Sequence, residues 1–371
     1  DTIGSFTGDG TISVVAQHTL RAFGDNSDET FSGVIVGEGS LEKLGTGTLT
    51  LAGTNTYAGS TTISNGTLVI GGNGSLGSGT YGGFVVNNGN FIYNSTTNQS
   101  LSNRMSGTGN LTQNGTGTLT LSLDPLFNNT YTGNTTINGG VLRISSDGQL
   151  GNTTSQLVLN GGTLWTTANL TLNVSRSVIL GANGGTFDQT TGTALTYAGV
   201  IDGAGSLNKV GMGTLTLSGA NTYTGATNVS AGAFNVSGTL ADTTTVNVSS
   251  GATYNVLSND TIASFSGAGS ITLGNGNTLT AFSDNSSASY GGDLSGAGGF
   301  TKAGTGTLTL TGTNTYNGTT TIDAGTLQLG DSGTTGSIAG SVVNNGMLVF
   351  NRSNAVTMNS SQIISGSGNL T

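Results

Sequence analysis

Cysteine is absent from this 371-residue chain, and proline and histidine each occur once. Without cysteine no disulfide framework can brace the fold, so its stability must come from the backbone ladder and the core. The single histidine, His18, excludes a metal site built on two histidine ligands. No stretch approaches the ~18 apolar residues of a membrane-spanning helix, so we expect no membrane insertion by this segment.

Charge is also scarce. Seventeen acidic and eight basic residues give a net charge of −9, and charged residues make up 7% of the chain. Lysine and arginine form no cluster, so we do not expect nucleic acid or an anionic membrane as a partner. What remains is a surface rich in threonine, serine and asparagine, which is wetted by water yet tolerates close packing against other polar surfaces.

Glycine is abundant instead, and much of it recurs in a repeat. A cassette that contains G-x-G-T-L-T-L, then N-T-Y, then a second short apolar stretch occurs four times, near residues 37–71, 107–145, 203–238 and 296–330. Repetition of this kind predicts a solenoid, in which each repeat buries its apolar face only by stacking on its neighbours.

Each cassette predicts two strands with one buried face. In Thr48-Leu49-Thr50-Leu51 apolar and polar residues alternate, which is the period of a half-buried strand. Leucine would point inward, and the β-branched threonine suits the outer pleated face. The inward core positions of the four cassettes are then Leu49, Leu51, Leu68, Leu119, Leu121, Leu142, Leu215, Leu217, Phe234, Leu308, Leu310 and Leu327.

The two strands return at a fixed distance. Leu49 and Leu68 are 19 residues apart, and the third and fourth cassettes repeat this spacing. In the second cassette the distance is 23, because residues 124–127 are inserted at a corner. A constant return with a tolerant corner predicts an all-β fold, a parallel β-solenoid of roughly 18 coils that forms one continuous elongated rod.

A longer period overlies the cassettes. Asp1-Thr2-Ile3-Gly4-Ser5-Phe6 is echoed by Asp260-Thr261-Ile262-Ala263-Ser264-Phe265, an offset of 259. Residues 1–259 are therefore expected to form one superunit, and residues 260–371 the start of the next. The sequence stops at Thr371 within a cassette, which predicts a fragment of a longer array.

The cassette resembles the passenger-associated transport repeat of bacterial autotransporters. The resemblance rests on the string from Gly37 to Leu68 and its three later copies, with Gln113 where the others have Lys43, Lys209 and Lys302. It implies a right-handed parallel β-helix exported across the outer membrane of a Gram-negative bacterium, with the C-terminal translocator β-barrel of the same protein as its partner. That barrel is not in this chain. The implied location is extracellular, at the bacterial cell surface.

Enzymes also use parallel β-helices, so an enzyme is an alternative that requires catalytic groups in the sequence. A carboxylate pair could be drawn only from Asp25, Asp28 and Glu29, or from Glu38 and Glu42. The first group lies in a polar turn and is best interpreted as a solvated corner. The glycine-rich stretch at residues 71–76 has serine where a calcium-binding repeat needs aspartate. We therefore expect no catalytic residues, no metal site and no cofactor.

Three further positions of the cassette carry polar groups. The tyrosines of the N-T-Y motif, Tyr57, Tyr131, Tyr223 and Tyr316, are expected to pack over their own corners, although a sugar-stacking stripe is an alternative. The asparagine before each of them could join an amide ladder if equivalent corners superpose. The lysines are expected to lie at the coil edge with their amines in water.

These features favour an adhesive, non-enzymatic surface protein. Its partners would be other copies of itself, or a host, matrix or glycan surface. A purely architectural stalk, fibre or surface layer is the alternative, and a polysaccharide lyase or hydrolase is the third hypothesis.

Overall fold

The computed structural model describes residues 2–122, 128–358 and 360–371. These residues form strands, bends and two short 3₁₀-helices, with no α-helix among them. The chain divides into two compact units, residues 1–186 and 187–371. Residues 124–127, the insert noted in the sequence, lie outside the described residues. Among the described residues no helix is long and apolar enough to cross a membrane.

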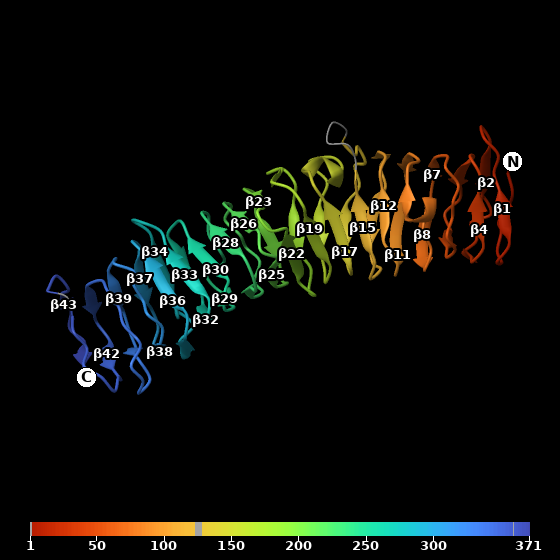
Figure 1. Cartoon of the computed structure of the whole chain (residues 1–371). Helices are drawn as coiled ribbons and strands as arrows, with labels where there is room; N and C mark the ends of the chain where they lie inside the picture. The colour runs from red at the N-terminus through yellow and green to blue at the C-terminus, as the bar shows by residue number, and fades with distance from the viewer. Residues whose placement is uncertain (1, 123–127, 359) are drawn as a thin grey trace. The chain divides into compact units, whose positions relative to one another are not determined.

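The first unit is a parallel β-solenoid, a stack of backbone coils whose strands pair only with the coils before and after (Figure 1). One stack contains β2 (Thr19–Ala22), β5 (Ser40–Lys43), β7 (Thr61–Ile63), β10 (Val85–Asn87) and β13 (Met105–Ser106). A second contains β3 (Glu29–Phe31), β6 (Thr48–Leu51), β8 (Thr67–Gly72), β11 (Asn90–Ser95), β14 (Asn110–Gln113), β16 (Thr135–Ile137), β18 (Leu157–Leu159) and β21 (Val178–Leu180). A third contains β9 (Thr80–Tyr81), β12 (Gln99–Leu101), β15 (Thr118–Leu121), β17 (Val141–Ile144) and β19 (Thr163–Thr166).

A few elements of this unit lie outside the three stacks. They are the pair β1 (Thr11–Ser13) and β4 (Val34–Val36), the strand β20 (Leu170–Leu172), and the 3₁₀-helices η1 (Gly77–Gly79) and η2 (Asp147–Leu150). Strand β22 (Gly185–Gln189) begins in the first unit and ends in the second.

The second unit has the same construction. Its longest stack contains β25 (Leu207–Val210), β27 (Thr227–Val229), β29 (Thr245–Val248), β32 (Ser264–Gly267), β35 (Ala288–Tyr290), β38 (Thr307–Leu310), β40 (Thr326–Leu329), β42 (Met347–Phe350) and β44 (Asn369–Leu370). A second contains β23 (Ala194–Tyr197), β26 (Thr214–Leu217), β28 (Ala233–Val236), β30 (Thr253–Val256), β33 (Ser270–Leu273) and β36 (Asp293–Gly296). A third contains β31 (Asp260–Thr261), β34 (Thr278–Ala281), β37 (Gly299–Lys302), β39 (Thr320–Ile322), β41 (Val342–Asn344) and β43 (Ile364–Ser365), and β24 (Ile201–Gly203) completes the unit.

In each cassette the two residues separated by the return distance lie opposite each other on neighbouring coils. Leu49 lies opposite Leu68 in the parallel pair of β6 and β8. The second cassette pairs Leu119 with Leu142 although its loop is longer. The remaining two cassettes pair leucine with Phe234 and with Leu327. Identical inward positions therefore stack on one another and form the apolar interior of each unit, as a parallel β-solenoid requires.

One glycine of the cassette is required by the backbone. Gly66, just before β8, has φ +67°, a left-handed conformation that favours glycine. A Cβ at this position would lie 2.4 Å from the carbonyl oxygen of Gly47 on the preceding coil. Gly140, Gly232 and Gly325 also have positive φ, from 51° to 66°, and a Cβ at each would lie 2.1–2.4 Å from a carbonyl oxygen of the preceding coil. The corner before the second strand therefore admits no side chain.

Candidate functional site

The leucines of the cassettes face the interior of each unit. In every cassette the first strand shows alternating buried and half-buried residues, with leucine buried and threonine half-buried. The exposed fraction is 0–2% for Leu49, Leu51, Leu68, Leu119, Leu121, Leu142, Leu215, Leu217, Phe234, Leu308, Leu310 and Leu327. These side chains are inaccessible to a partner, so any binding surface lies on the outward threonine face.

The cassette tyrosines are also fully buried. Each hydroxyl lies 2.6 Å from the hydroxyl of the threonine four residues later, such as Thr61 for Tyr57 and Thr135 for Tyr131. The pairs Tyr223–Thr227 and Tyr316–Thr320 have the same geometry. Burial raises the pKa of Tyr57 and of Tyr131 to about 12, because the charged phenolate would be desolvated. A ring with no exposed area cannot stack on a sugar, so these tyrosines brace the corner.

The cassette asparagines do not form an amide ladder with one another. The Asn55 side chain accepts a hydrogen bond from the backbone N–H of Ile35, 20 residues earlier. Its amide nitrogen donates to the carbonyls of Gly53 and Ser75. Asn129, Asn221 and Asn314 cap the backbone of adjoining coils in the same way. The ladder hypothesis is wrong for these residues, because cassettes are separated by intervening coils and the nearest partners are backbone groups.

The three lysines are buried, and the expectation that they lie at the coil edge in water is wrong. Lys43, Lys209 and Lys302 have no exposed surface. The Lys209 amine donates to the carbonyls of Val210 and Gly211 at 2.7 and 2.8 Å, and to Ala231 on the next coil at 3.1 Å. The other two lysines make equivalent contacts. The physical reason is that the glycine turn points its carbonyls inward, where only a donor from the core can satisfy them.

Burial disfavours the charged form of these amines. It lowers the pKa of Lys209 to about 8, although the negative charge of Asp188 acts in the opposite direction. The pKa values of Lys43 and Lys302 are also lowered by burial. Such shifts mark many catalytic lysines. Here each amine is fully engaged with backbone carbonyls, which indicates a structural role.

The acidic turn near the N-terminus behaves as a corner. Asp25 accepts hydrogen bonds from the backbone and hydroxyl of Ser27, which lower the pKa of its carboxyl group. Asp28 accepts from the backbone N–H of Thr48 on the following coil. Glu42 pairs with Arg21 at 2.8 Å. His18 is exposed and contacts the carbonyl of Ala16. None of these contacts forms the close carboxylate pair that glycosidic cleavage needs.

No group of three or more His, Cys, Asp or Glu side chains that could hold a metal ion occurs among residues 2–122, 128–358 and 360–371.

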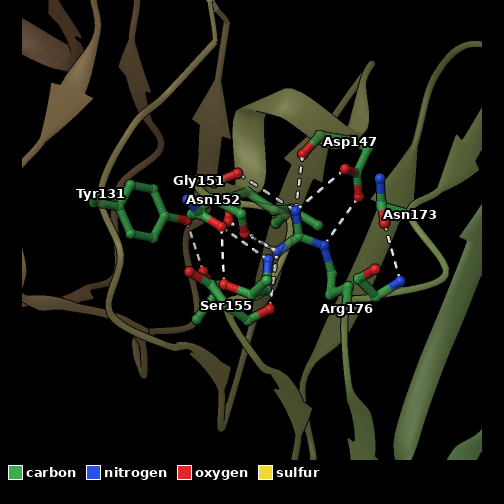
Figure 2. Close-up of polar contacts among 11 residues, drawn as sticks. Tyr131, Asp147, Gly151, Asn152, Ser155, Asn173 and Arg176 are labelled. Atoms are coloured by element: carbon green, nitrogen blue, oxygen red, sulfur yellow. Dashed lines mark hydrogen bonds and ion pairs between the residues drawn. The ribbon is translucent and has the colours of Figure 1, made fainter.

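A buried arginine, which the sequence did not single out, holds the corner that contains η2 (Figure 2). The Arg176 guanidinium pairs with the carboxylate of Asp147 at 2.9 Å. It also donates to the carbonyls of Leu150, Asn152 and Ser155 at 3.0–3.2 Å. The ion pair and the carbonyl contacts together offset the cost of burying the charge. No local pattern links two residues 29 positions apart, so the sequence offered no signal for this contact.

Asp260 occupies a capping position like that of the cassette asparagines. Its carboxylate is 5% exposed and accepts from the backbone N–H of Leu240, 20 residues earlier, at 3.1 Å. Asn221 accepts from Ile201 at the same separation, but it also donates to two carbonyls. Burial raises the pKa of Asp260 to about 7. A recess of about 370 Å³ opens beside it and is lined by polar side chains.

The outer face of the coils is polar and internally hydrogen-bonded. The amide of Asn138 donates to Asn114 at 2.9 Å, and that of Asn160 donates to Asn138 at 3.4 Å. The backbone N–H of Asn183 continues this exposed ladder by donating to Asn160. In the second unit Asn228 donates to Asn208 and Asn255 donates to Asn235. Amide ladders therefore exist, although at outward positions and not at the N-T-Y corners.

The chain is similar to one repeat family and to a curated autotransporter adhesin. The model of the passenger-associated-transport-repeat matches residues 41–70, 111–144, 207–236 and 300–329. The adhesin BmaC autotransporter of Brucella suis biovar 1 (strain 1330) is 37% identical over 183 residues, which cover 48% of this chain and 5% of the relative. No solved structure matches the chain.

Proposed function

We propose that this chain, a β-helical segment of the autotransporter passenger family, mediates adhesion or cell–cell aggregation through the polar outer face of its coils. The observation that carries the proposal is the division between the two faces of each strand. Inward positions are filled mainly by apolar side chains, and the buried lysines and asparagines of the cassettes bind backbone groups. Outward positions present threonine, serine and asparagine in repeated rows.

Rows of hydroxyl and amide groups suit extended contact with another polar surface. Each hydroxyl offers one donor and two acceptor sites, and each amide offers both kinds of group. The spacing of equivalent groups is that of adjacent strands, about 4.8 Å, over several coils. Many weak hydrogen bonds acting in parallel can then give a firm attachment through multivalency. The relative that bears the name adhesin supports this proposal.

The proposed role is non-enzymatic. Asp25 and Asp28 of the N-terminal turn accept hydrogen bonds from backbone N–H groups, and Glu42 pairs with Arg21. The shifted lysine amines are buried against carbonyl groups and cannot reach a substrate. A substrate screen in which Asp25→Asn or Glu29→Gln abolished turnover would overturn this part of the proposal.

The four matches to the passenger-associated-transport-repeat and the similarity to an autotransporter adhesin support display at the cell surface. We propose that a C-terminal translocator domain of the same polypeptide carries the chain across the outer membrane of a Gram-negative bacterium. Protease treatment of intact cells that express the full protein tests this placement. Removal of epitopes in residues 1–371 from intact cells is the expected result, and protection of those epitopes until the cells are lysed would contradict it.

We also propose that the assembly unit of the passenger is the 259-residue superunit. Local geometry at equivalent positions supports it. Phe23 and Phe282 have φ of 68° and 69°, in a region that side chains rarely adopt. The backbone N–H of Thr46 donates to Asn26 at 2.7 Å, and that of Thr305 donates to Asn285 at 2.8 Å. The coding sequence on either side of this segment tests the proposal, because the same offset should recur there.

The adhesive role is tested with cells that display the full passenger and with cells from which residues 1–371 have been deleted in frame. Displaying cells should clump, or attach to coated surfaces, more strongly than the deletion strain at equal surface expression. Equal clumping and attachment by both strains would refute the proposal. Exposure measured by antibody labelling is the control, since a deletion that impairs export would give a false positive.

A further inference from the structure

The outer face of the third stack of the first unit carries the sole tryptophan of the chain. Strands β12, β15, β17 and β19 lie side by side there (Figure 1). The register places Ser100 opposite Thr120, Thr120 opposite Arg143, and Arg143 opposite Trp165. All four side chains are half-buried between fully buried neighbours, so they point away from the core. They form one outward row across four coils.

Arg143 in this row has a charge without an ionic partner. Its guanidinium carbon lies 4.7 Å from the centre of the Trp165 ring, a cation–π contact. Among the described residues its N–H groups donate to no other group. Arg21 and Arg176, by contrast, are paired with carboxylates. The indole therefore holds the planar guanidinium in place while its in-plane donors stay available.

Hydroxyl groups surround this free cation. A recess of about 270 Å³ beside Arg143 is lined by Ser100, Thr120, Ser122, Ser145 and Thr167. Ser122, Ser145 and Thr167 come two residues after members of the first row, so they form a second outward row parallel to it. The hydroxyls of Ser100 and Ser122 lie 2.6 Å apart and connect the rows.

The stretch of sequence that contains this row, residues 44–187, has no net negative charge that would repel an anion, although the whole chain is acidic. Between Lys43 and Asp188 there are three arginines and two aspartates. One of the aspartates, Asp147, is neutralised by Arg176. The local balance is therefore close to zero or slightly positive, in contrast to the net charge of −9.

From this arrangement we propose that the outward row from Ser100 to Trp165 is a binding site for an acidic oligosaccharide. A carboxylate or sulfate group pairs with the guanidinium of Arg143 through two parallel hydrogen bonds. Sugar hydroxyls exchange hydrogen bonds with the serine and threonine rows, and the apolar face of a sugar ring packs against the exposed part of the indole. The row spans three strand spacings, about 14 Å, which suits a short oligomer better than a single sugar.

The site deepens the proposed adhesive function and rests on it for its biological setting. Binding itself is a property of the isolated chain, so the two can fail separately. If the purified chain binds and displaying cells do not adhere, the adhesive function is refuted and the site stands. Adhesion without binding by the purified chain leaves the adhesive function and refutes the site.

Trp165 provides a direct readout, because no other tryptophan contributes to the fluorescence. Short oligogalacturonates and sulfated glycosaminoglycan oligomers are titrated into the 371-residue chain, with neutral malto-oligosaccharides of equal length and inorganic sulfate as comparisons. We expect a saturable change in emission with at least one acidic oligomer. The neutral oligomers and sulfate should give no saturable change at the same concentrations.

Three variants connect the signal to the row. Arg143→Gln should weaken binding at least tenfold, and Arg143→Lys should weaken it less because it keeps the charge and loses the bidentate contact. Arg104→Gln is the matched control, since Arg104 is an exposed arginine with no described contact to an aromatic ring. It should bind as the parent does. Unfolding curves of all three should coincide with that of the parent.

Several results would overturn the site. They are the absence of a saturable change with every acidic oligomer, equal binding of neutral and acidic oligomers, and binding that Arg143→Gln leaves unaltered. Saturation by inorganic sulfate alone with the affinity of the oligomers would reduce the row to a simple anion site, which also contradicts the proposal.

Discussion

Three cassettes bury a lysine at the position where the second cassette buries Gln113. The lysine amines each donate to three backbone carbonyls, two in the following turn and one on the next coil. The Gln113 amide donates to the carbonyls of Gly115 and Gly117 at 3.0 and 2.7 Å. The position therefore requires a donor at the end of a long side chain, and a positive charge is not essential.

The difference also shows what glutamine costs. Its amide oxygen enters the same pocket of inward carbonyls and finds no hydrogen-bond partner among the described residues. Lysine brings three donors and no acceptor, so it fits a ring of carbonyls without a mismatch. Lysine in turn has the cost of a buried charge, as the lowered pKa of Lys209 indicates. Glutamine leaves one buried acceptor without a partner, whereas lysine buries a positive charge.

The largest expected loss of stability comes from a buried polar group that has no partner. Leu49→Asp places a carboxylate among apolar side chains and should destabilise its coils by more than about 4 kcal/mol. Thr50→Asp, one residue later on the outer face and opposite Thr30 on the preceding coil, should change stability by less than about 0.5 kcal/mol. Limited proteolysis of both variants measures the contrast. Equal loss of protease resistance would contradict the assignment of inner and outer faces.

Asp260 caps the backbone of an adjoining coil as a hydrogen-bond acceptor, but an ionised carboxylate lacks the N–H donors that Asn221 has in the equivalent role. Its folded pKa is about 7, whereas an ordinary aspartate has 3.8. Folding then takes up a proton, so this group favours the folded state most below pH 3.8. The advantage is lost as the pH rises from 3.8 to about 7. Asp260→Asn should therefore stabilise the second unit at pH 8, by up to about 4 kcal/mol.

The measurement for Asp260→Asn is urea unfolding of parent and variant at pH 4, 6 and 8. The gain should grow with pH and reach a plateau above pH 7. A gain that is the same at all three values would show that the carboxyl group does not titrate in the folded protein as described.

Removing a satisfied donor should have the next largest effect. Lys209→Met keeps the apolar stem and leaves three carbonyls without their donor, so we expect a loss of about 3 kcal/mol. Lys209→Gln copies the second cassette and should lose about 1 kcal/mol. Hydrogen exchange of the amides in β26 and β28 reports the local opening. Equal exchange rates in the two variants would show that the amine contributes charge or bulk and not hydrogen bonds.

The smallest expected effect is a gain. Gln113→Lys removes the unpartnered amide oxygen and supplies a third donor, which should stabilise the second cassette by about 1 kcal/mol. Hydrogen exchange in β15 and β17 measures it. A destabilised variant would indicate that the pocket around residue 113 cannot neutralise a charge, and glutamine would then be the better choice at that site.

The sequence predicted the fold because the information is local and repeated. The alternation in Thr48-Leu49-Thr50-Leu51 identifies a half-buried strand, and the 19-residue return gives the partner of each strand. One rule applied four times predicted the β-solenoid. The burial of the lysines was missed because the same residue type normally lies at a surface, and the inward carbonyls that hold it belong to the turn geometry. Neither the Arg176–Asp147 pair nor the row of Arg143 and Trp165 could be found from one strand, since both depend on which coils lie next to each other.

The three lysines lie inside the solenoid, where an amine-selective reagent in solution cannot reach them. Acetylation of the folded chain with an amine-selective reagent at pH 8, followed by peptide mass spectrometry, measures their accessibility. Lys43, Lys209 and Lys302 should stay unmodified in the folded chain and react fully after denaturation in guanidinium chloride. Rapid modification of any of them in the folded chain would contradict the claim that these amines cap carbonyls in the core.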